Sequence, residues 1–216
     1  NPESIDKRIK LLFPPIKKYL KQNNKTVFDL VLAVPNENAD SSTRSSYDIS
    51  KIWNIAQAQI LTLKNLRRQY LENKVVVRFN DTHGTGQQFI REIVPHLKDL
   101  NCKIFVVCLT ITLDAIKSFQ SLNIDFTILP SKPSRNAFDI FRTNEIKRIE
   151  QIGNALYPLH PLGYGKQGLL TVYYYQCPNN TLPIIWANGK NNKIGGHSIK
   201  WSALFEYRPK KGQKSF

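Results

Sequence analysis

Four runs of apolar residues constrain the fold of this chain more than any other feature. They cover residues 28–34, 75–79, 104–111 and 124–129. A mainly apolar run is typical of a strand buried on both faces, and segments of helical periodicity separate these runs. The alternation predicts an α/β fold with a doubly wound, mainly parallel sheet.

Helical periodicity predicts the elements between the strands. We expect a short helix from Ser4 that ends at Pro14 and Pro15, then a turn or two at 16–21. Longer helices are expected at 52–71, 86–97, 113–122 and 141–156. The polar segment 35–50 predicts a long loop, and loops of that length are usually functional. Ligands of parallel sheets bind at the carboxyl ends of strands, so this loop and the turn after residue 79 are expected at one site.

The last third of the chain lacks the alternation of apolar runs and helical segments. It contains a basic helical segment at 141–156, a segment rich in Pro and Gly at 158–165, and expected strands at 169–175 and 182–186. We therefore expect residues 1–135 to form the α/β core, including the N-terminal helices. Residues 136–216 are expected to form a small C-terminal cap packed on the same domain.

The most informative stretch follows the second apolar run. Its residues are Asn80, Asp81, Thr82, His83, Gly84, Thr85, Gly86 and Gln87. Backbone N–H groups of a glycine-rich turn before a helix favour a phosphate. A carboxylate just before such a turn can accept hydrogen bonds from ribose hydroxyls. The pattern predicts a site for a phosphorylated ribose.

Other glycine-rich loops fit this stretch less well. A P-loop needs Lys and a hydroxyl residue where Gln87 and Gln88 stand, and a dinucleotide fingerprint needs Gly where Phe89 stands. A purely structural interpretation stays open, in which the glycines only allow the chain to turn.

The charge of the chain points to a polyanionic partner, a phosphorylated substrate, or both. The formal net charge is +15 and the pI is about 9.8. Basic residues gather at both ends of the chain: Lys7, Arg8, Lys10, Lys17, Lys18, Lys21 and Lys25, then Lys190, Lys193, Lys200, Arg208, Lys210, Lys211 and Lys214. One substrate site does not need so many, which suggests nucleic acid or a partner that carries it. A solvated basic surface is the alternative.

Cysteine usage suggests the compartment. Cys102, Cys108 and Cys177 are an odd number without metal-like spacing, and a thiol in an apolar run behaves as a small hydrophobe. We therefore expect a reducing cytoplasm. No apolar stretch approaches the ~20 residues that span a bilayer, and the first residues lack the apolar core of a signal peptide. A membrane partner is not expected.

A strand, the Asn-Asp pair and a Thr-Gly before a helix resemble the ribose 5-phosphate loop of type I phosphoribosyltransferases. The resemblance implies that the amides of 82–87 bind the phosphate and that Thr85 adds a hydroxyl donor. It also implies that Asp81 accepts from the ribose hydroxyls and helps to hold Mg²⁺. Chemistry in such enzymes passes through an oxocarbenium-like state and rests on positioning and electrostatic stabilisation.

Two positions depart from that family. Asn80 stands where the first of two acids is expected, and Gly84 stands where some members carry an acid. These departures weaken the expected magnesium site and put turnover in question. His83 is the nearest titratable residue, and we expect it to be structural or solvent-facing rather than catalytic.

Two further groups of residues are candidates for ligand contacts. The pyrophosphate-binding loop of the family follows the first strand, which selects Ser42, Thr43, Arg44 and Ser45, because a guanidinium binds phosphate bidentately. Tyr164, between two glycines, is a candidate to stack on a base, and Asn179 and Asn180 are candidates to read its polar edge. A packed aromatic ring and two turns are the alternative at this third group.

The segments Pro-Leu-Gly-Tyr-Gly at 161–165 and Pro-Asn-Asn-Thr-Leu-Pro-x-x-Trp at 178–186 carry a narrower resemblance. They resemble phosphoribosyltransferase-like domains of bacterial conflict and antiphage loci, some of them beside retron reverse transcriptases, over most of the chain. This implies an effector that acts on a nucleotide or phosphoribosyl compound, in a complex with a reverse transcriptase and its RNA–DNA product. The fold of the family often dimerises, so a homo-oligomer is open.

The alternative function is a non-catalytic nucleotide- or nucleic-acid-binding module with a decayed site, marked by Asn80 and Gly84. A nucleotide-salvage enzyme fits less well, because of the charge and the incomplete acidic pair.

Overall fold

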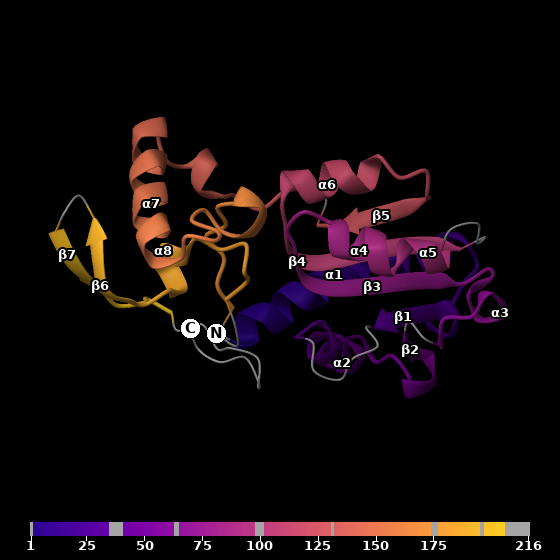
Figure 1. The fold of residues 1–216 in the computed structure, drawn as a ribbon. Coiled ribbons are helices and arrows are strands. Elements are labelled where there is room, and N and C mark those ends of the chain that lie inside the picture. Colours follow the sequence, from indigo (N-terminus) through magenta and orange to yellow (C-terminus); the bar gives the residue numbers. More distant parts are fainter. Residues whose placement is uncertain are drawn as a thin grey trace. The chain divides into compact units, whose positions relative to one another are not determined.

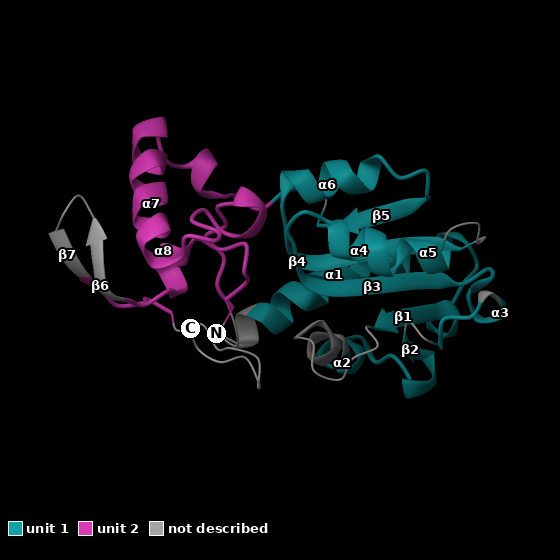
Figure 2. Ribbon diagram, viewed as in Figure 1, with its two compact units in different colours: residues 1–133 teal, residues 134–216 magenta. Residues whose placement is uncertain are grey.

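The computed structural model describes residues 2–34, 41–62, 65–97, 102–130, 132–173, 177–194 and 197–205. The chain divides into two compact units, Asn1–Pro133 and Ser134–Phe216, which Figure 2 colours separately. No helix in the described ranges is both long enough and apolar enough to cross a membrane.

Unit 1 contains a five-stranded sheet and the helices that cover it (Figure 1). Its elements are α1 (Pro2–Gln22), the 3-10 turn η1 (Val27–Asp29), β1 (Leu30–Val34), α2 (Ser41–Trp53), the 3-10 turn η2 (Gln57–Gln59), β2 (Ile60–Thr62), α3 (Arg68–Leu71), β3 (Val75–His83), α4 (Gln87–Glu92), α5 (Val94–Leu97), β4 (Lys103–Ile111), α6 (Leu113–Gln120) and β5 (Phe126–Leu129).

The sheet confirms the predicted fold class. Its strands lie in the order β2-β1-β3-β4-β5, and every neighbouring pair is parallel. The four predicted apolar runs became β1, β3, β4 and β5, because their side chains are needed on both faces of a covered sheet. β3 continues beyond the predicted end at residue 79, through Asn80 and Asp81 to His83.

Helices cover both faces of this sheet. On one face Tyr19 of α1 meets Phe105 of β4, with ring centroids 5.6 Å apart. Trp53 of α2 stacks on Phe13 of α1 at 4.7 Å, and its indole N–H donates to the carbonyl of Ile9. The other face carries a cluster of buried residues from the strands and from α4, α5 and α6: Val76, Ile104, Val106, Phe89, Ile93, Leu97 and Phe119 among them.

Two helix predictions in unit 1 were wrong. α1 is continuous through Pro14 and Pro15, although proline removes two backbone donors, because the helix buries one apolar stripe on the sheet side: Ile9, Phe13, Ile16 and Leu20. The predicted helix 52–71 is instead the end of α2, a turn, the edge strand β2 and the short α3. Asn54, at φ 55°, ends α2, and the apolar Ile60 and Leu61 pair with β1. Short apolar runs fit a helix or a strand equally well on periodicity alone.

A third prediction, one helix over 86–97, holds in part. The segment forms two short helices, α4 and α5, that meet at Ile93.

Unit 2 contains the 3-10 turn η4 (Ala137–Asp139), α7 (Thr143–Leu156), the turn η5 (Tyr164–Lys166), α8 (Pro183–Trp186), and the antiparallel pair β6 (Gly189–Ile194) and β7 (His197–Trp201). The predicted strand 182–186 was wrong, since Pro183 opens the helix α8 at a position where proline is favoured. Within the described part of 169–175, Leu169 forms only isolated bridges, to Asn136 and Thr181. Leu169 therefore joins the chain segments at Asn136 and Thr181 where a regular strand was expected.

Candidate functional site

The site begins where β3 extends beyond the end of its neighbour β1. The last aligned pair of these strands is Ala33 with Arg78, whereas β3 stays paired with β4 as far as His83 and Ile111. The chain leaves β1 toward β2 on one side and returns as β3 on the other. Such a switch in strand order is where doubly wound sheets bind ligands, outside the carboxyl ends of the strands. The turn at 84–86 follows β3 at this position.

Gly86 is the residue that this turn requires. Its φ of 75° lies in the left-handed region, and it caps α4. A Cβ at Gly86 would lie 2.8 Å from Cε1 of Phe119 and 3.4 Å from Cα of Ala115. The turn therefore lies directly on α6, with no room for a side chain at this residue.

Thr112, the N-cap residue of α6, ties the turn to that helix. Its backbone N–H donates to the carbonyl of His83 at 3.0 Å, and its hydroxyl donates to the carbonyl of Gly84. The same hydroxyl accepts from the amide of Ala115 at 3.1 Å, and Thr112 is 1% exposed. One side chain thus fixes both the start of α6 and the first peptide of the turn.

Three consecutive amides of the turn have no acceptor among the described residues. They are the N–H groups of Gly84, Thr85 and Gly86. The next amide, that of Gln87, donates to the hydroxyl of Thr85 at 3.5 Å. Gly84 and Gly86 are buried and Thr85 is half-buried. Adjacent unpaired amides of this kind form anion-binding concavities in proteins.

The polar pair before the turn lies within β3 and is buried. The Asn80 amide donates to the carbonyl of Thr82 at 3.0 Å. Oδ1 of Asp81 accepts from the amide of Thr82 at 2.7 Å, and Asp81 is only 5% exposed. Both side chains thus make hydrogen bonds to the strand's own backbone next to the turn.

His83 is buried, so the solvent-facing half of its expectation was wrong. It is 3% exposed, and its ring makes edge-on contacts with Phe89 and Phe119 at centroid distances of 6.1 Å and 5.2 Å. Burial, and to a lesser degree the positive charge of Arg78, lowers the pKa of His83 from 6.5 to about 3. The imidazole is neutral at physiological pH, and its Nε2 has no hydrogen-bond partner among the described residues.

No group of three or more His, Cys, Asp and Glu side chains lies close enough to hold a metal ion in the described ranges. Asp81 is the carboxylate next to the turn, and its partner position carries the neutral Asn80. Magnesium sites in proteins commonly use one or two carboxylates together with substrate phosphates. These residues therefore fit a magnesium ion only if a phosphate-bearing ligand supplies most of its oxygens.

The second predicted group does not lie on a loop. Ser42, Thr43, Arg44 and Ser45 belong to the first turns of α2, and the side chains of 41–46 lie outside the described part of the structure. The expectation of a loop over 35–50 was wrong from residue 41 onward. Ile49 and Trp53, one helical turn apart and both buried, fix the helix against the sheet. Residues 35–40 lie outside the described ranges.

The third predicted group comes together within unit 2. The amide N–H of Tyr164 donates to the carbonyl of Asn179 at 2.8 Å, and the side-chain amide of Asn180 donates to the carbonyl of Tyr164 at 3.0 Å. Asn180 is buried, whereas Asn179 is exposed and the Tyr164 side chain is 46% exposed. The ring of Tyr164 meets His160 edge-on at 5.0 Å. Asn180 thus holds the backbone that presents Tyr164.

Two residues at the site were missed from the sequence. Arg78 interrupts an apolar run yet is 2% exposed, and its guanidinium donates to the carbonyl of Ala33 at 3.4 Å. A charged residue inside a run that reads as a buried strand was the available signal. Thr112 offered only the pattern of a helix N-cap, which gives no hint of its bond to Gly84.

Comparison with known protein families gives one match. The family model PRTase-CE matches residues 10–206, which include both units' candidate residues. A search of curated proteins found no match for the chain.

Proposed function

Because the chain belongs to the PRTase-CE family, a phosphoribosyltransferase-like family, we propose that it is an effector that acts on a nucleotide or a phosphoribosyl compound. The observation that carries the proposal is the turn after β3. The backbone N–H groups of Gly84, Thr85 and Gly86 have no acceptor among the described residues, and the turn lies where the strand order of the parallel sheet switches.

The residues have distinct roles in this proposal. Within the segment 82–87, the amides of Gly84, Thr85 and Gly86 are proposed to hold the 5-phosphate, with the hydroxyl of Thr85 as a side-chain donor. Asp81 accepts hydrogen bonds from the ribose hydroxyls and faces the positive charge that develops as the bond at C1 breaks. Arg78, buried in the same strand, adds a positive charge that favours an anionic ligand at this edge of the sheet.

Further ligand contacts are assigned to the other two groups. Ser42, Thr43, Arg44 and Ser45 are proposed to bind pyrophosphate, and Tyr164, Asn179 and Asn180 to bind the base. Magnesium, when bound, would neutralise pyrophosphate, with Asp81 as the protein carboxylate next to it and Asn80 as a neutral neighbour.

A second candidate function is favoured by one observation. Asn80 and Asp81 both bond to the backbone of Thr82, and the pair carries one carboxylate rather than two. Burial lowers the pKa of His83 to about 3, so its imidazole is a weak base and a poor candidate for general-base catalysis near neutral pH. These facts support a module that binds a nucleotide or nucleic acid without turning it over.

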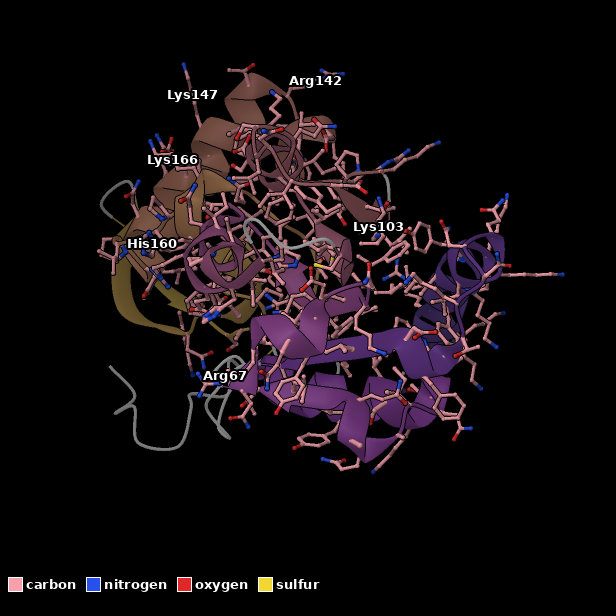
Figure 3. All side chains as sticks on the ribbon, turned by 90° about the vertical axis from the view of Figure 1, so that its right-hand side faces the viewer. Arg67, Lys103, Arg142, Lys147, His160 and Lys166 are labelled. Atoms are coloured by element: carbon pink, nitrogen blue, oxygen red, sulfur yellow. The ribbon has the colours of Figure 1, made fainter. Side chains whose placement is uncertain are left out.

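We further propose that the protein works in the cytoplasm in a bacterial antiphage complex of the retron type. Its partners would be a reverse transcriptase and the RNA–DNA product of that enzyme. The charge of +15 supports a polyanionic partner. Exposed cations of unit 2 supply part of the charge, and Figure 3 shows Arg142, Lys147 and Lys166 extending outward from the ribbon.

The test is mass spectrometry of nucleotide pools in bacteria that express the protein with its partners and a phage trigger. Asp81→Ala is the test variant. Asp125→Ala is the matched control, because Asp125 is exposed and forms an ion pair with Lys103 at the other end of β4 from the turn.

An enzyme predicts loss of one nucleotide or of phosphoribosyl pyrophosphate with the wild type and the control, and no loss with Asp81→Ala. Unchanged pools with all three proteins, together with measurable binding of ribose 5-phosphate, would select the non-catalytic module. Unchanged pools and no binding of ribose 5-phosphate or of an RNA–DNA hybrid would overturn both functions.

A further inference from the structure

The turn after β3 does not determine its own conformation. Three of its contacts come from the first turn and the body of α6: the Thr112 amide on the carbonyl of His83, the Thr112 hydroxyl on the carbonyl of Gly84, and the ring of Phe119 against Gly86. Glycine residues are the least restricted conformationally, so Gly84 and Gly86 need such contacts to hold one arrangement.

The bond from Thr112 to Gly84 also sets the direction of a donor. In a trans peptide the carbonyl of residue i and the N–H of residue i+1 point in opposite directions. The peptide between Gly84 and Thr85 is trans, since the cis bond in the described chain is Leu129–Pro130. When the Gly84 carbonyl is held toward Thr112, the Thr85 N–H is turned away from α6. Thr85 is the half-buried residue of the turn, between two buried glycines.

We propose that Thr112 is a positioning residue that orients the phosphate-binding amides, through its hydroxyl bond to the carbonyl of Gly84. The inference rests on the proposed function, because it concerns how the turn meets a phosphate. Thr112 itself does not touch the ligand. Without its hydroxyl the Gly84 peptide is free to rotate, and the Thr85 N–H loses its fixed direction.

The test compares two substitutions at this residue. Thr112→Val keeps the shape but removes the donor to Gly84 and the acceptor for Ala115. Thr112→Ser keeps the hydroxyl and remains a good N-cap. The matched control is Thr181→Val in unit 2, because the Thr181 hydroxyl is also buried and donates to a loop carbonyl, that of Thr171, at 2.7 Å. Ribose 5-phosphate is the probe, since it carries no base and so does not depend on the loops near Asn180.

Binding is measured by isothermal titration calorimetry on the full chain, after circular dichroism has established that each variant is folded. We expect Thr112→Val to bind about tenfold or more weakly, which corresponds to about 1.4 kcal/mol. Thr112→Ser and Thr181→Val should bind within about twofold of the wild type, which is well under 1 kcal/mol. Equal binding by the wild type and Thr112→Val would overturn the inference and leave the proposed function intact. No binding by the wild type would overturn the proposed function itself.

A second measurement needs no variant, which matters if Thr112→Val fails to fold. In nitrogen-15 NMR spectra of the wild type, ribose 5-phosphate should shift the amide resonances of Thr85 and its neighbours in the turn. The amide of Ala115 already donates to the Thr112 hydroxyl in the free protein. Its resonance should therefore keep its chemical shift when ribose 5-phosphate binds. A large shift at Ala115 would mean that ligand binding builds the anchor, and would contradict a preset orientation.

Discussion

His83 illustrates how a polar residue next to a candidate ligand site can be buried among aromatic rings. Its ring packs edge-on against Phe89 and Phe119, which also contact each other, and its Nε2 has no partner among the described residues. A buried neutral imidazole stays neutral only while the protein is folded. Protonation is therefore coupled to unfolding.

The first prediction concerns the pH dependence of stability. The pKa of His83 is about 3 in the folded protein and about 6.5 when unfolded, so the unfolded chain binds the extra proton between these values. Stability is then lost as the pH falls below 6.5. Compared with a His83→Gln variant, the wild type should lose roughly 1 kcal/mol more of its unfolding free energy for each unit between pH 6 and 4. Urea denaturation at several pH values measures this, and parallel curves for the two proteins would contradict it.

The second prediction concerns the thiols. Burial raises the pKa of Cys102 and of Cys177 to about 11, and burial together with the charge of Asp81 raises that of Cys108 still further. The thiolate is the reactive form, so little of it exists at neutral pH. Iodoacetamide should alkylate the cysteines of the native protein slowly. In the protein unfolded in guanidinium, it should alkylate all three cysteines. Rapid alkylation of native Cys108, detected by peptide mass spectrometry, would show that β4 is more open than the structure has it.

At the scale of elements, the contacts of α7 allow a test of packing against propensity. Gly153 lies within α7, and a Cβ there would lie 2.0 Å from the carbonyl oxygen of Pro161. Helix propensity alone favours alanine over glycine by about 1 kcal/mol. Inserting an extra methyl group into a well-packed site usually lowers the unfolding free energy by about 1–3 kcal/mol.

The third prediction is therefore that Gly153→Ala lowers the unfolding free energy of the chain by about 1 kcal/mol or more, despite its better propensity. The matched control is Asn154→Ala at the next residue, which is exposed and should change stability by less than about 0.5 kcal/mol. Guanidinium denaturation followed by circular dichroism compares the two. A stabilised Gly153→Ala would mean that the loop at Pro161 moves away freely.

The sequence was a reliable guide to the strands and a poor guide to several helices. Buried parallel strands leave a mainly apolar run, and β1, β3, β4 and β5 were found from such runs. β2 and α8 were not, because three or four apolar residues fit either element until their neighbours are known. The first turns of α2 were missed for another reason: they are rich in serine and therefore resemble a loop, whereas the buried apolar residues Ile49 and Trp53 lie farther along the helix.

The turn itself was found, but its supports were not. Residues 80–87 stand together in the sequence, so their pattern was visible. Thr112 reaches Gly84 across 28 positions, and Arg78 reaches the carbonyl of Ala33 across 45. Contacts between residues so far apart depend on which strands are neighbours, and one sequence does not specify that order.

At the scale of the whole molecule, net charge is the dominant property. A protein that neutralises phosphates releases counterions, so its affinity for nucleic acid falls steeply as salt rises. The fourth prediction is that a fluorescent RNA–DNA hybrid binds the full chain and loses about tenfold or more in affinity between roughly 50 and 200 mM salt. Fluorescence anisotropy measures this.

A variant with Arg142, Lys147 and Lys166 replaced by Gln tests the contribution of unit 2. If these side chains contact phosphates, each loss should reduce the slope of log affinity against log salt by roughly 0.7–0.9. The slope of log affinity against log salt is the decisive quantity. A loss of folding would lower the affinity but would not reduce this slope by a fixed amount for each residue replaced. Binding that does not depend on salt would argue against nucleic acid as the partner of the basic surface.

The outermost strands of the sheet are its shortest. β2 has three residues and β5 has four, whereas the central β3 and β4 have nine each. A strand edge recruits another chain through its unpaired backbone groups, and short edges offer few of them. A sheet running continuously through two copies of this protein is therefore disfavoured. Self-association through unit 1 is then expected to use its helix faces, and the edges of its sheet are poor templates for the strand addition that seeds aggregates.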